Sequence, residues 1–412
     1  MKSRWARIVV SCLMILAIVA ALSLSCGKKE KEGRTIVIGH ISDMSGPAAT
    51  ALIPINYALK DLATYYNDNN LIPGVTFKVV EWDSRYDNSR IIPGWDWIRG
   101  RGAVLGFTAF PSVGEVLKPF AETEKMPVWA LAYGEALDYP PGWVFLANCP
   151  NRNLINPLLK WISENDPDFP TDRPAKIGSA GWAETYAVAC KAAVKEYAEA
   201  HPDKWEWVGG YLEPQGAMIW TADVAGLKDC DYLWPPSTGT GTSTFMKQFR
   251  DKGYTAKFIG TDAHAAYKSL IIDTVGWAGV DGMLATSPTR WWTETQSPIV
   301  SLARQLLQTY HPGKFDEFVY AGIGYIGGFH QSYAFFDILK KAIEDVGAEN
   351  FNGQAFYDTA IHFSQNQWPT YEPWNFTETR RYTWNAVGIY EWSAAAQDIV
   401  RIVDPWLPNN VT

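Results

Sequence analysis

Residues 103–134 constrain the fold of this chain more than any other stretch. They contain two short apolar runs, 103–107 and 128–132, which are typical of parallel strands buried on both faces. Between these runs, apolar residues recur at helical spacing over residues 113–124, and Pro127 separates this predicted helix from the second run. The stretch therefore predicts a strand, a helix and a second strand in an open parallel sheet.

Ser112 stands at the junction between the first strand and the helix, and Glu115 follows three residues later. This spacing predicts a capping box. Free N–H groups at a helix N-terminus attract anions, and open parallel sheets bind ligands at the carboxyl ends of their strands. Two interpretations remain open: Ser112 only caps its helix, or it holds the carboxylate of a ligand.

The same alternation of strands and helices continues on both sides of this unit. A first set contains predicted strands at residues 35–41 and 75–82, with a helical pattern at 49–67 between them. A second set begins near residue 149, with predicted strands at 176–180, 207–212, 257–260 and 281–288. The 412 residues are enough for two domains or more. We therefore predict an α/β fold with two doubly wound halves.

The N-terminus predicts export from the cytoplasm. Three basic residues and no acidic one accompany an apolar run of about 17 residues, which Cys26 and a polar segment follow. The sequence LSLSC resembles a bacterial lipobox, with the preferred leucine, Leu22, one position early. We predict a lipoprotein signal peptide over residues 1–26, a lipid on Cys26, and a tether over residues 27–34. An uncleaved anchor helix is the alternative, and either one attaches the body to a membrane.

Composition restricts the partners. The formal net charge of -8 and the lack of a basic cluster argue against nucleic acid as a partner. With 47% hydrophobic and 19% charged residues, the chain is globular and can bury a large core. The exported body contains Cys149, Cys190 and Cys230, so one disulfide with one remaining thiol is permitted. Their spacing does not fit a metal site, and we expect no metal or cofactor.

Motifs for catalysis are incomplete. The sequence FPSVG is similar to a nucleophile elbow, but Phe110 replaces its first glycine, and neither His330 nor His362 has a recognisable context. The glycine-rich STGTGTST lacks the lysine of a P-loop. Asp262 and His264 provide only two potential metal ligands, and His264 is expected at a helix start. We therefore predict that the protein is not an enzyme, with a serine hydrolase as a remote alternative.

Several segments occur in an order that is typical of one family. They are TIVIGHISDMSGP, VLGFTAFPSVGEV, MPVWALAYGEA, KIGSAGWAETYAVACKAAV, FMKQFRDKGYTAKFIGTDAH, DGMLATSP and VGIYEW. In this order the chain resembles the branched-chain amino acid (Leu/Ile/Val-type) solute-binding proteins of ABC importers, which have the type I periplasmic-binding-protein fold. The resemblance implies two doubly wound parallel-sheet lobes, joined by a three-strand hinge, that close on a ligand. It places lobe 1 at residues 34–148 and 285–365, and lobe 2 at residues 149–284 and 366–412.

The resemblance also implies where the ligand binds. In the family, a serine and backbone N–H groups hold the ligand carboxylate. The matching positions here are Ala109, Ser112, Ala132, Tyr133 and Gly134. A family acid that contacts the ligand ammonium matches Asp262, whose alternative role is that of a helix N-cap.

Further positions complete the expected site. Trp182 matches an aromatic residue of the family, although the glycines that follow it there are lost. Ser45 follows the first strand, and Thr238 belongs to a loop that replaces a family tyrosine contact. We expect Tyr133 and Trp182 to stack on the ligand. With Phe110, they suggest a cleft for an aromatic or larger organic acid.

The resemblance therefore implies a monomeric, lipid-anchored protein of the periplasm or cell surface that performs no chemistry. It would bind a small molecule, an amino acid or another carboxylate, and deliver it to the membrane permease of an ABC importer. The alternative is that the same fold serves as the ligand-sensing module of a signalling system.

Overall fold

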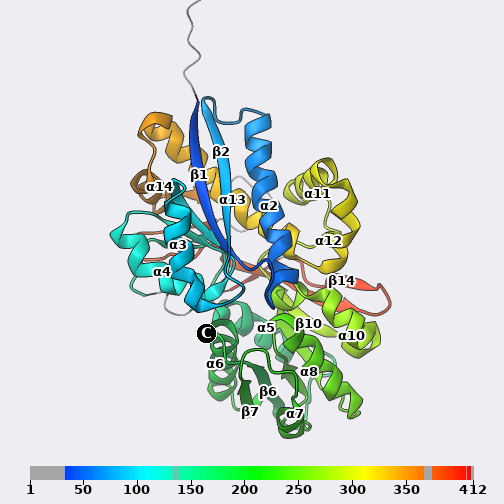
Figure 1. Ribbon diagram of the computed structural model, residues 1–412. Coiled ribbons are helices and arrows are strands. Elements are labelled where there is room, and N and C mark those ends of the chain that lie inside the picture. The colour runs from blue at the N-terminus through cyan, green and yellow to red at the C-terminus, as the bar shows by residue number, and fades with distance from the viewer. Residues whose placement is uncertain are drawn as a thin grey trace, which may run out of the picture.

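The computed structural model describes residues 33–132, 134, 137, 139–365, 374–404 and 406–409. These residues form two α/β lobes, one above the other in Figure 1. Among them, no helix combines the length and the apolar character that a membrane span requires. The predicted signal peptide, its Cys26 and the tether up to residue 32 lie outside the described residues.

The first lobe contains, in the described part of the chain, a five-stranded parallel sheet with the order β2-β1-β3-β4-β5. Its strands are β1 (Arg34–Ser42), β2 (Val75–Asp83), β3 (Ala103–Thr108), β4 (Val128–Ala130) and β5 (Val144–Leu146). The order reverses between β1 and β3, and ligands bind at such a switch point in open α/β sheets.

Helices cover both faces of this sheet (Figure 1). Helix α2 packs along α13 on one face, and α3 packs beside α4 on the other. The helices of this lobe are α2 (Ala49–Asp68), α3 (Ile91–Arg99), α4 (Pro111–Thr123), α11 (Pro298–Tyr310), α12 (Phe315–Ala321), α13 (Gly324–Val346) and α14 (Gly353–Ala360). The short elements are the 3-10 helices Asn88–Arg90, Pro312–Lys314 and Ala348–Asn350, and the strand pair β11 (Ser364–Gln365) and β12 (Trp374–Asn375).

The second lobe has the sheet order β14-β13-β10-β9-β8-β6-β7, and β15 pairs with β13. The parallel strands are β6 (Ala175–Trp182), β7 (Trp205–Glu213), β8 (Tyr232–Trp234), β9 (Lys257–Thr261) and β10 (Met283–Ser287). The antiparallel strands are β13 (Ala386–Ser393), β14 (Asp398–Arg401) and β15 (Leu407–Pro408). The helices are α5 (Asn151–Asn165), α6 (Thr185–Ala200), α7 (Thr221–Gly226), α8 (Gly239–Asp251), α9 (Asp262–Ala265) and α10 (Lys268–Val280).

The apolar runs seen in the sequence become the buried strands of the sheets. Every residue of β4, β5, β8 and β10 is buried, as expected for strands covered on both faces. Trp129 in β4 is fully buried and packs against Phe335 of α13, with their ring centroids 5.4 Å apart. The predicted α/β fold with two parallel-sheet lobes is confirmed.

The predicted capping box at Ser112 is wrong, and the alternative role of Asp262 as a helix N-cap is not observed. Helix α4 begins at Pro111, and its N-cap Phe110 makes no side-chain cap bond, so Ser112 forms no capping box. Proline suits the first helical position, because its φ is already helical and its missing N–H would have no partner there. In α9 the N-cap is Thr261, which forms a capping box with His264, so Asp262 is the first helical residue instead of the N-cap.

Three segments of the described chain connect the lobes: β5 to α5, β10 to α11, and β12 to β13. The first and the third run side by side. The backbone N–H of Leu146 donates to the carbonyl of Arg381 at 2.7 Å, and the N–H of Thr383 donates to the carbonyl of Asn148 at 3.0 Å. These two connections therefore form one hydrogen-bonded ribbon.

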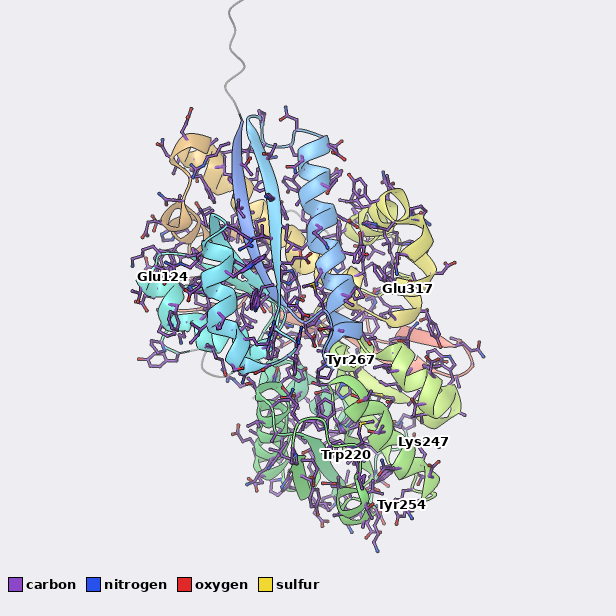
Figure 2. All side chains as sticks on the ribbon, in the orientation of Figure 1. Glu124, Trp220, Lys247, Tyr254, Tyr267 and Glu317 are labelled. Carbon is purple, nitrogen blue, oxygen red and sulfur yellow. The ribbon has the colours of Figure 1, made fainter. Side chains whose placement is uncertain are left out.

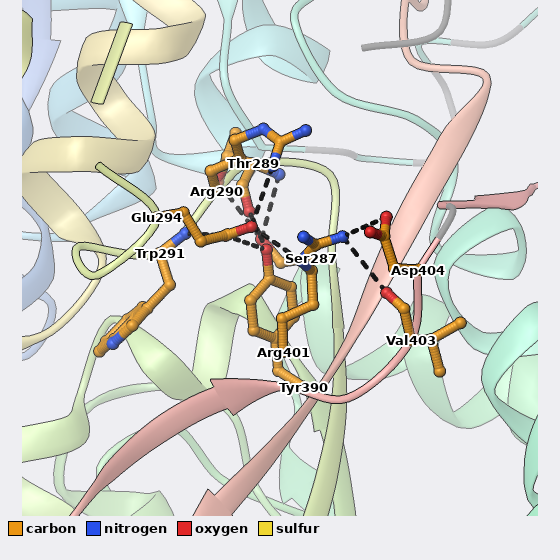
Figure 3. A network of polar contacts seen from close by, with 9 residues as sticks. All are labelled: Ser287, Thr289, Arg290, Trp291, Glu294, Tyr390, Arg401, Val403 and Asp404. Carbon is orange, nitrogen blue, oxygen red and sulfur yellow. Dashed lines mark hydrogen bonds and ion pairs between the residues drawn. The ribbon is translucent and has the colours of Figure 1, made fainter. Parts of the chain in front are cut away.

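A buried polar network holds the second connection (Figure 3). The carboxylate of Glu294 accepts hydrogen bonds from the guanidinium of Arg290 at 3.0 Å and from the backbone N–H of Trp291 at 2.8 Å. It also accepts the Tyr390 hydroxyl at 2.8 Å and pairs with Nε of Arg401 at 2.8 Å. Since Tyr390 lies in β13 and Arg401 in β14, the network fastens this connection to the edge of the second sheet.

The cysteines of the body do not form a disulfide. Cys149, Cys190 and Cys230 are all buried and free. Burial raises the pKa of each thiol, to about 12 for Cys230. Among the described residues, no group of three or more His, Cys, Asp or Glu side chains could hold a metal ion.

Candidate functional site

A cavity of about 120 Å³ lies between the two lobes. The first lobe contributes the start of α2, the loops after β2, β3 and β4, and one face of α13. The second lobe contributes the segments that follow β6, β8 and β9. Both sheets therefore direct the carboxyl ends of their strands at this cavity, which is where open α/β sheets bind ligands.

The wall from the first lobe is mainly apolar. Helix α2 supplies Ala51, Leu52 and Ile55. Helix α13 approaches α2 closely because it has glycines there: a Cβ added to Gly328 would lie 3.0 Å from Ile55, and one added to Gly324 would lie 2.8 Å from the carbonyl of Ala51. Such an apolar wall with few polar groups is typical of small-molecule sites.

Asp262 gives the wall from the second lobe its charge. It is half-buried, directly after β9, and lines the cavity. Burial raises the pKa of its carboxyl to about 7. Hydrogen bonds from the Ala263 backbone and the Thr261 side chain act in the opposite direction and lower this pKa. No ion pair of Asp262 occurs among the described side chains, so no cationic side chain there compensates its charge.

Three tyrosines surround the cavity: Tyr86, Tyr186 and Tyr267. Their hydroxyl groups are bound within the protein. The hydroxyl of Tyr186 lies 2.7 Å from Oγ1 of Thr261, that of Tyr86 is hydrogen-bonded to the Thr238 side chain, and that of Tyr267 to the backbone of Gly239. Burial raises the pKa of all three phenols. Figure 2 labels Tyr267 where the lobes meet.

The lobes contact each other beside this cavity. Oγ of Ser112 in α4 lies 3.1 Å from Oγ1 of Thr185 in α6, and the Gln215 amide donates to the carbonyl of Tyr86 at 3.4 Å. These contacts surround a second pocket of about 350 Å³. Glu184 lines this pocket too, and burial raises the pKa of its carboxyl, while it caps α6 by accepting the N–H groups of Tyr186 and Ala187. The lobes are therefore in a closed arrangement.

The structure brings some of the predicted site residues together in the cavity. Ala109, Ala132, Thr238 and Asp262 all line it. Ala109 and Ala132 follow β3 and β4 of the first lobe, and Thr238 and Asp262 follow β8 and β9 of the second. Tyr133 lies outside the described residues.

Other predicted residues lie elsewhere. Ser112 lines the second pocket instead of the cavity, because its hydroxyl is directed at Thr185. Trp182 is buried, and its indole N–H donates to the carbonyl of Ala217 at 2.9 Å. Ser45 is exposed and donates to the carboxylate of Asp83 at 2.6 Å. Gly134 is buried, and an added Cβ would collide with Glu115. None of these four lines the cavity.

The sequence-based prediction missed several residues that line the cavity: Tyr86, Asn148, Tyr186, Ser237, Tyr267 and Gln331. Tyr86 and Tyr186 follow the carboxyl ends of β2 and β6, so this position could have indicated them. Gln331 has no local signal. It sits on α13, and its amide donates to the carbonyls of Ala147 and Leu131, far away in the sequence.

Comparisons with known proteins identify the class. Residues 35–396 match the family described as periplasmic binding protein, and the chain belongs to that family. Its members are extracytoplasmic solute-binding proteins. A search of curated proteins gave no match.

Solved structures are similar over nearly the whole chain. A branched-chain amino acid ABC transporter from Thermus thermophilus with bound valine has a TM-score of 0.77 at 16% identity, covering 91% of this chain and 96% of that one. A fatty acid ABC transporter substrate-binding protein from Thermomonospora curvata has a TM-score of 0.77 at 15% identity, with 92% and 93% covered. A solute-binding protein from R. palustris in complex with 4-hydroxybenzoate has a TM-score of 0.74 at 16% identity, with 91% and 97% covered. The chain therefore has the type I periplasmic-binding-protein fold.

Proposed function

We propose that this protein is an extracytoplasmic solute-binding protein that captures a small organic ligand between its lobes and delivers it to an ABC importer. The observation that carries the proposal is the cavity between the lobes, with an apolar wall on one side and the carboxyl group of Asp262 on the other. A ligand there would contact both lobes at once. The relatives whose structures contain or name valine, a fatty acid and 4-hydroxybenzoate support a small organic ligand.

The mechanism is a shift between open and closed populations. A ligand that contacts both walls binds the closed form more tightly than the open form, and this difference in affinity is the free energy available for closure. The closed protein would then dock on the permease. Attachment through a lipid on Cys26 would keep it at the membrane surface, where the encounter with the permease is local.

A thermal-shift screen of the purified protein tests the proposal. The panel holds aliphatic and aromatic amino acids, aromatic carboxylic acids, short amides, urea and simple amines. A ligand at 100 times its dissociation constant should add about 2.7 kcal/mol to the free energy of unfolding. We expect at least one compound of the panel to stabilise the protein.

Blocking the cavity should remove that stabilisation. Replacing Ala266, a small residue of the cavity wall, by Phe fills the space that the ligand needs. Replacing the exposed Ile92 of α3 by Phe is the matched control, and it should leave the shift intact. A ligand that stabilises the Ala266→Phe variant as much as the native protein would place the binding site elsewhere. Circular dichroism establishes that both variants are folded.

A further inference from the structure

The charged side chains that line the cavity are of one sign, among the residues that the structure describes. Among the described residues that line it, Asp262 is the only acid, and none is Lys, Arg or His. A ligand carboxylate would therefore lie near an uncompensated carboxyl group with no cationic side chain to balance it. Burial of an unpaired charge is costly, whereas an ammonium next to Asp262 would form a charge-assisted hydrogen bond.

The N-terminus of α4 offers few hydrogen-bond donors to an anion. The N–H of Phe110 already donates to Oγ1 of Thr108 at 3.0 Å, and the N–H of Val113 donates to the carbonyl of Phe110 at 3.0 Å. Pro111 has no N–H at all. The hydroxyl of Ser112 is directed at Thr185, and Ser112 lines the second pocket instead of the cavity. Most of the groups that make a helix N-terminus attractive to anions are therefore used or missing here.

The remaining groups suit a cation. Since the hydroxyls of Tyr86, Tyr186 and Tyr267 are bound within the protein, these residues present mainly aromatic carbon to the cavity. Aromatic rings attract ammonium groups electrostatically. Ser237, only 2% exposed, also lines the cavity, and its hydroxyl has no hydrogen-bond partner. An ammonium N–H could donate to this unused oxygen.

From this arrangement we infer that the ligand is a small organic ammonium ion that carries no carboxylate. The inference rests on the proposed function, since it names the ligand class of the same cavity. The ammonium contacts Asp262 and Ser237, and the apolar part of the ligand lies against α2. A cavity of about 150 Å³ holds benzene, so the ligand has on the order of six non-hydrogen atoms.

Titration calorimetry with four related probes tests the inference. Isobutylamine has the ammonium alone, valine has the same alkyl group with an ammonium and a carboxylate, 2-methylpropanoate has the carboxylate alone, and isobutanol is neutral. We expect isobutylamine to bind at least tenfold more tightly than each of the other three. Equal or tighter binding of valine or 2-methylpropanoate would overturn the inference and leave the proposed function standing.

Substitutions assign the contact. Asp262→Asn keeps the size of the side chain and removes the charge, and it should weaken the binding of isobutylamine at least tenfold. Asp203→Asn, at an exposed position of the same lobe, is the matched control and should change nothing. Ser237→Ala should weaken binding severalfold, which gives a second test if the Asn variant does not fold.

The outcomes separate the two proposals. If none of the four probes binds, the inference is wrong, because isobutylamine is small enough for the cavity. The proposed function is judged independently, by the wider panel and the Ala266→Phe block. If isobutylamine binds equally well to the native protein and the Asp262→Asn variant, the cation does not use this carboxyl group and the inference is also wrong.

Discussion

The hydroxyl oxygens of Ser112 and Thr185 lie 3.1 Å apart and connect α4 of the first lobe to α6 of the second. The contact lies outside the ligand cavity, in the second pocket. It is available only when the lobes are closed, and it does not require a ligand. The free energy of closure therefore has one part that belongs to the protein and another part that the ligand supplies.

We predict that Ser112→Ala opens the ligand-free protein. A hydrogen bond of this kind contributes about 0.5–1.5 kcal/mol, so its loss should lower the ratio of closed to open protein severalfold. Small-angle scattering of the ligand-free protein should show a larger radius of gyration. Ser163→Ala, on α5, removes an exposed hydroxyl that bonds only to its own helix, and it serves as the control. Thr185→Val should add nothing to Ser112→Ala; additive effects would mean that the two hydroxyls do not act as a pair.

The raised pKa of Asp262 predicts a pH-dependent stability. The folded pKa of about 7 lies above the ordinary value of 3.8, so the folded state binds the proton more tightly and loses stability as pH rises from about 4 to 7. Asp262→Asn removes this loss. The free energy of unfolding of Asp262→Asn minus that of the native protein should be greater at pH 8 than at pH 5, by on the order of 2 kcal/mol.

Denaturant unfolding at the two pH values measures this difference. The titratable groups around Asp262 do not interfere: burial raises the pKa values of Cys149, Cys190 and Tyr186, and lowers that of His264 to about 4. These groups therefore stay neutral between pH 5 and 8. Equal stability differences at both pH values would show that the Asp262 carboxyl titrates normally.

Glu294 should be essential for stability. Its carboxylate is paired with Arg290 and Arg401 and is nearly inaccessible, with its side chain 8% exposed. Glu294→Gln removes the buried carboxylate that Arg290 and Arg401 share, and breaking a buried pair in this way costs about 3–5 kcal/mol. Asp404 also pairs with Arg401, but the Asp404 side chain is 78% exposed. Asp404→Asn should therefore cost under about 1 kcal/mol. Similar midpoints of thermal unfolding for the two variants would contradict this assignment.

Trp182 should matter for folding and not for binding. Its ring lies against Gly241, where an added Cβ would be 2.9 Å from the indole, and its N–H is bonded to Ala217. Trp182→Phe should lower the free energy of unfolding by about 1–3 kcal/mol through lost packing and the lost hydrogen bond. Ligand affinity should remain within twofold. A large loss of affinity at unchanged stability would restore the expected stacking role.

The sequence predicted the sheets better than the site, for physical reasons. Buried parallel strands need continuous apolar runs, so β3 and β4 were visible in residues 103–134. The direction of a single side chain depends on neighbours that the sequence does not reveal. Ser112 was expected to hold a ligand carboxylate, but its hydroxyl is directed at Thr185, a residue of the other lobe.

Asp262 and Gln331 both line the cavity, but the sequence indicated only Asp262. Asp262 follows a predicted strand, and the family resemblance assigned it to the ligand; it lines the cavity. Gln331 lies in the middle of a long helix and reaches the cavity because α13 packs along α2 in the folded protein. Nothing in its local sequence distinguishes it from a core position, so only the assembled lobes could show it.

The ribbon formed by the first and third connections has a mechanical consequence. The first and third connections are hydrogen-bonded to each other through Leu146 and Thr383, so they cannot bend independently and should move as one unit. The second connection is fastened separately, through Glu294. Two fixed lines of attachment define one axis of rotation and resist both sliding and twisting of one lobe against the other. We therefore expect the lobes to open mainly by rotation about this one axis.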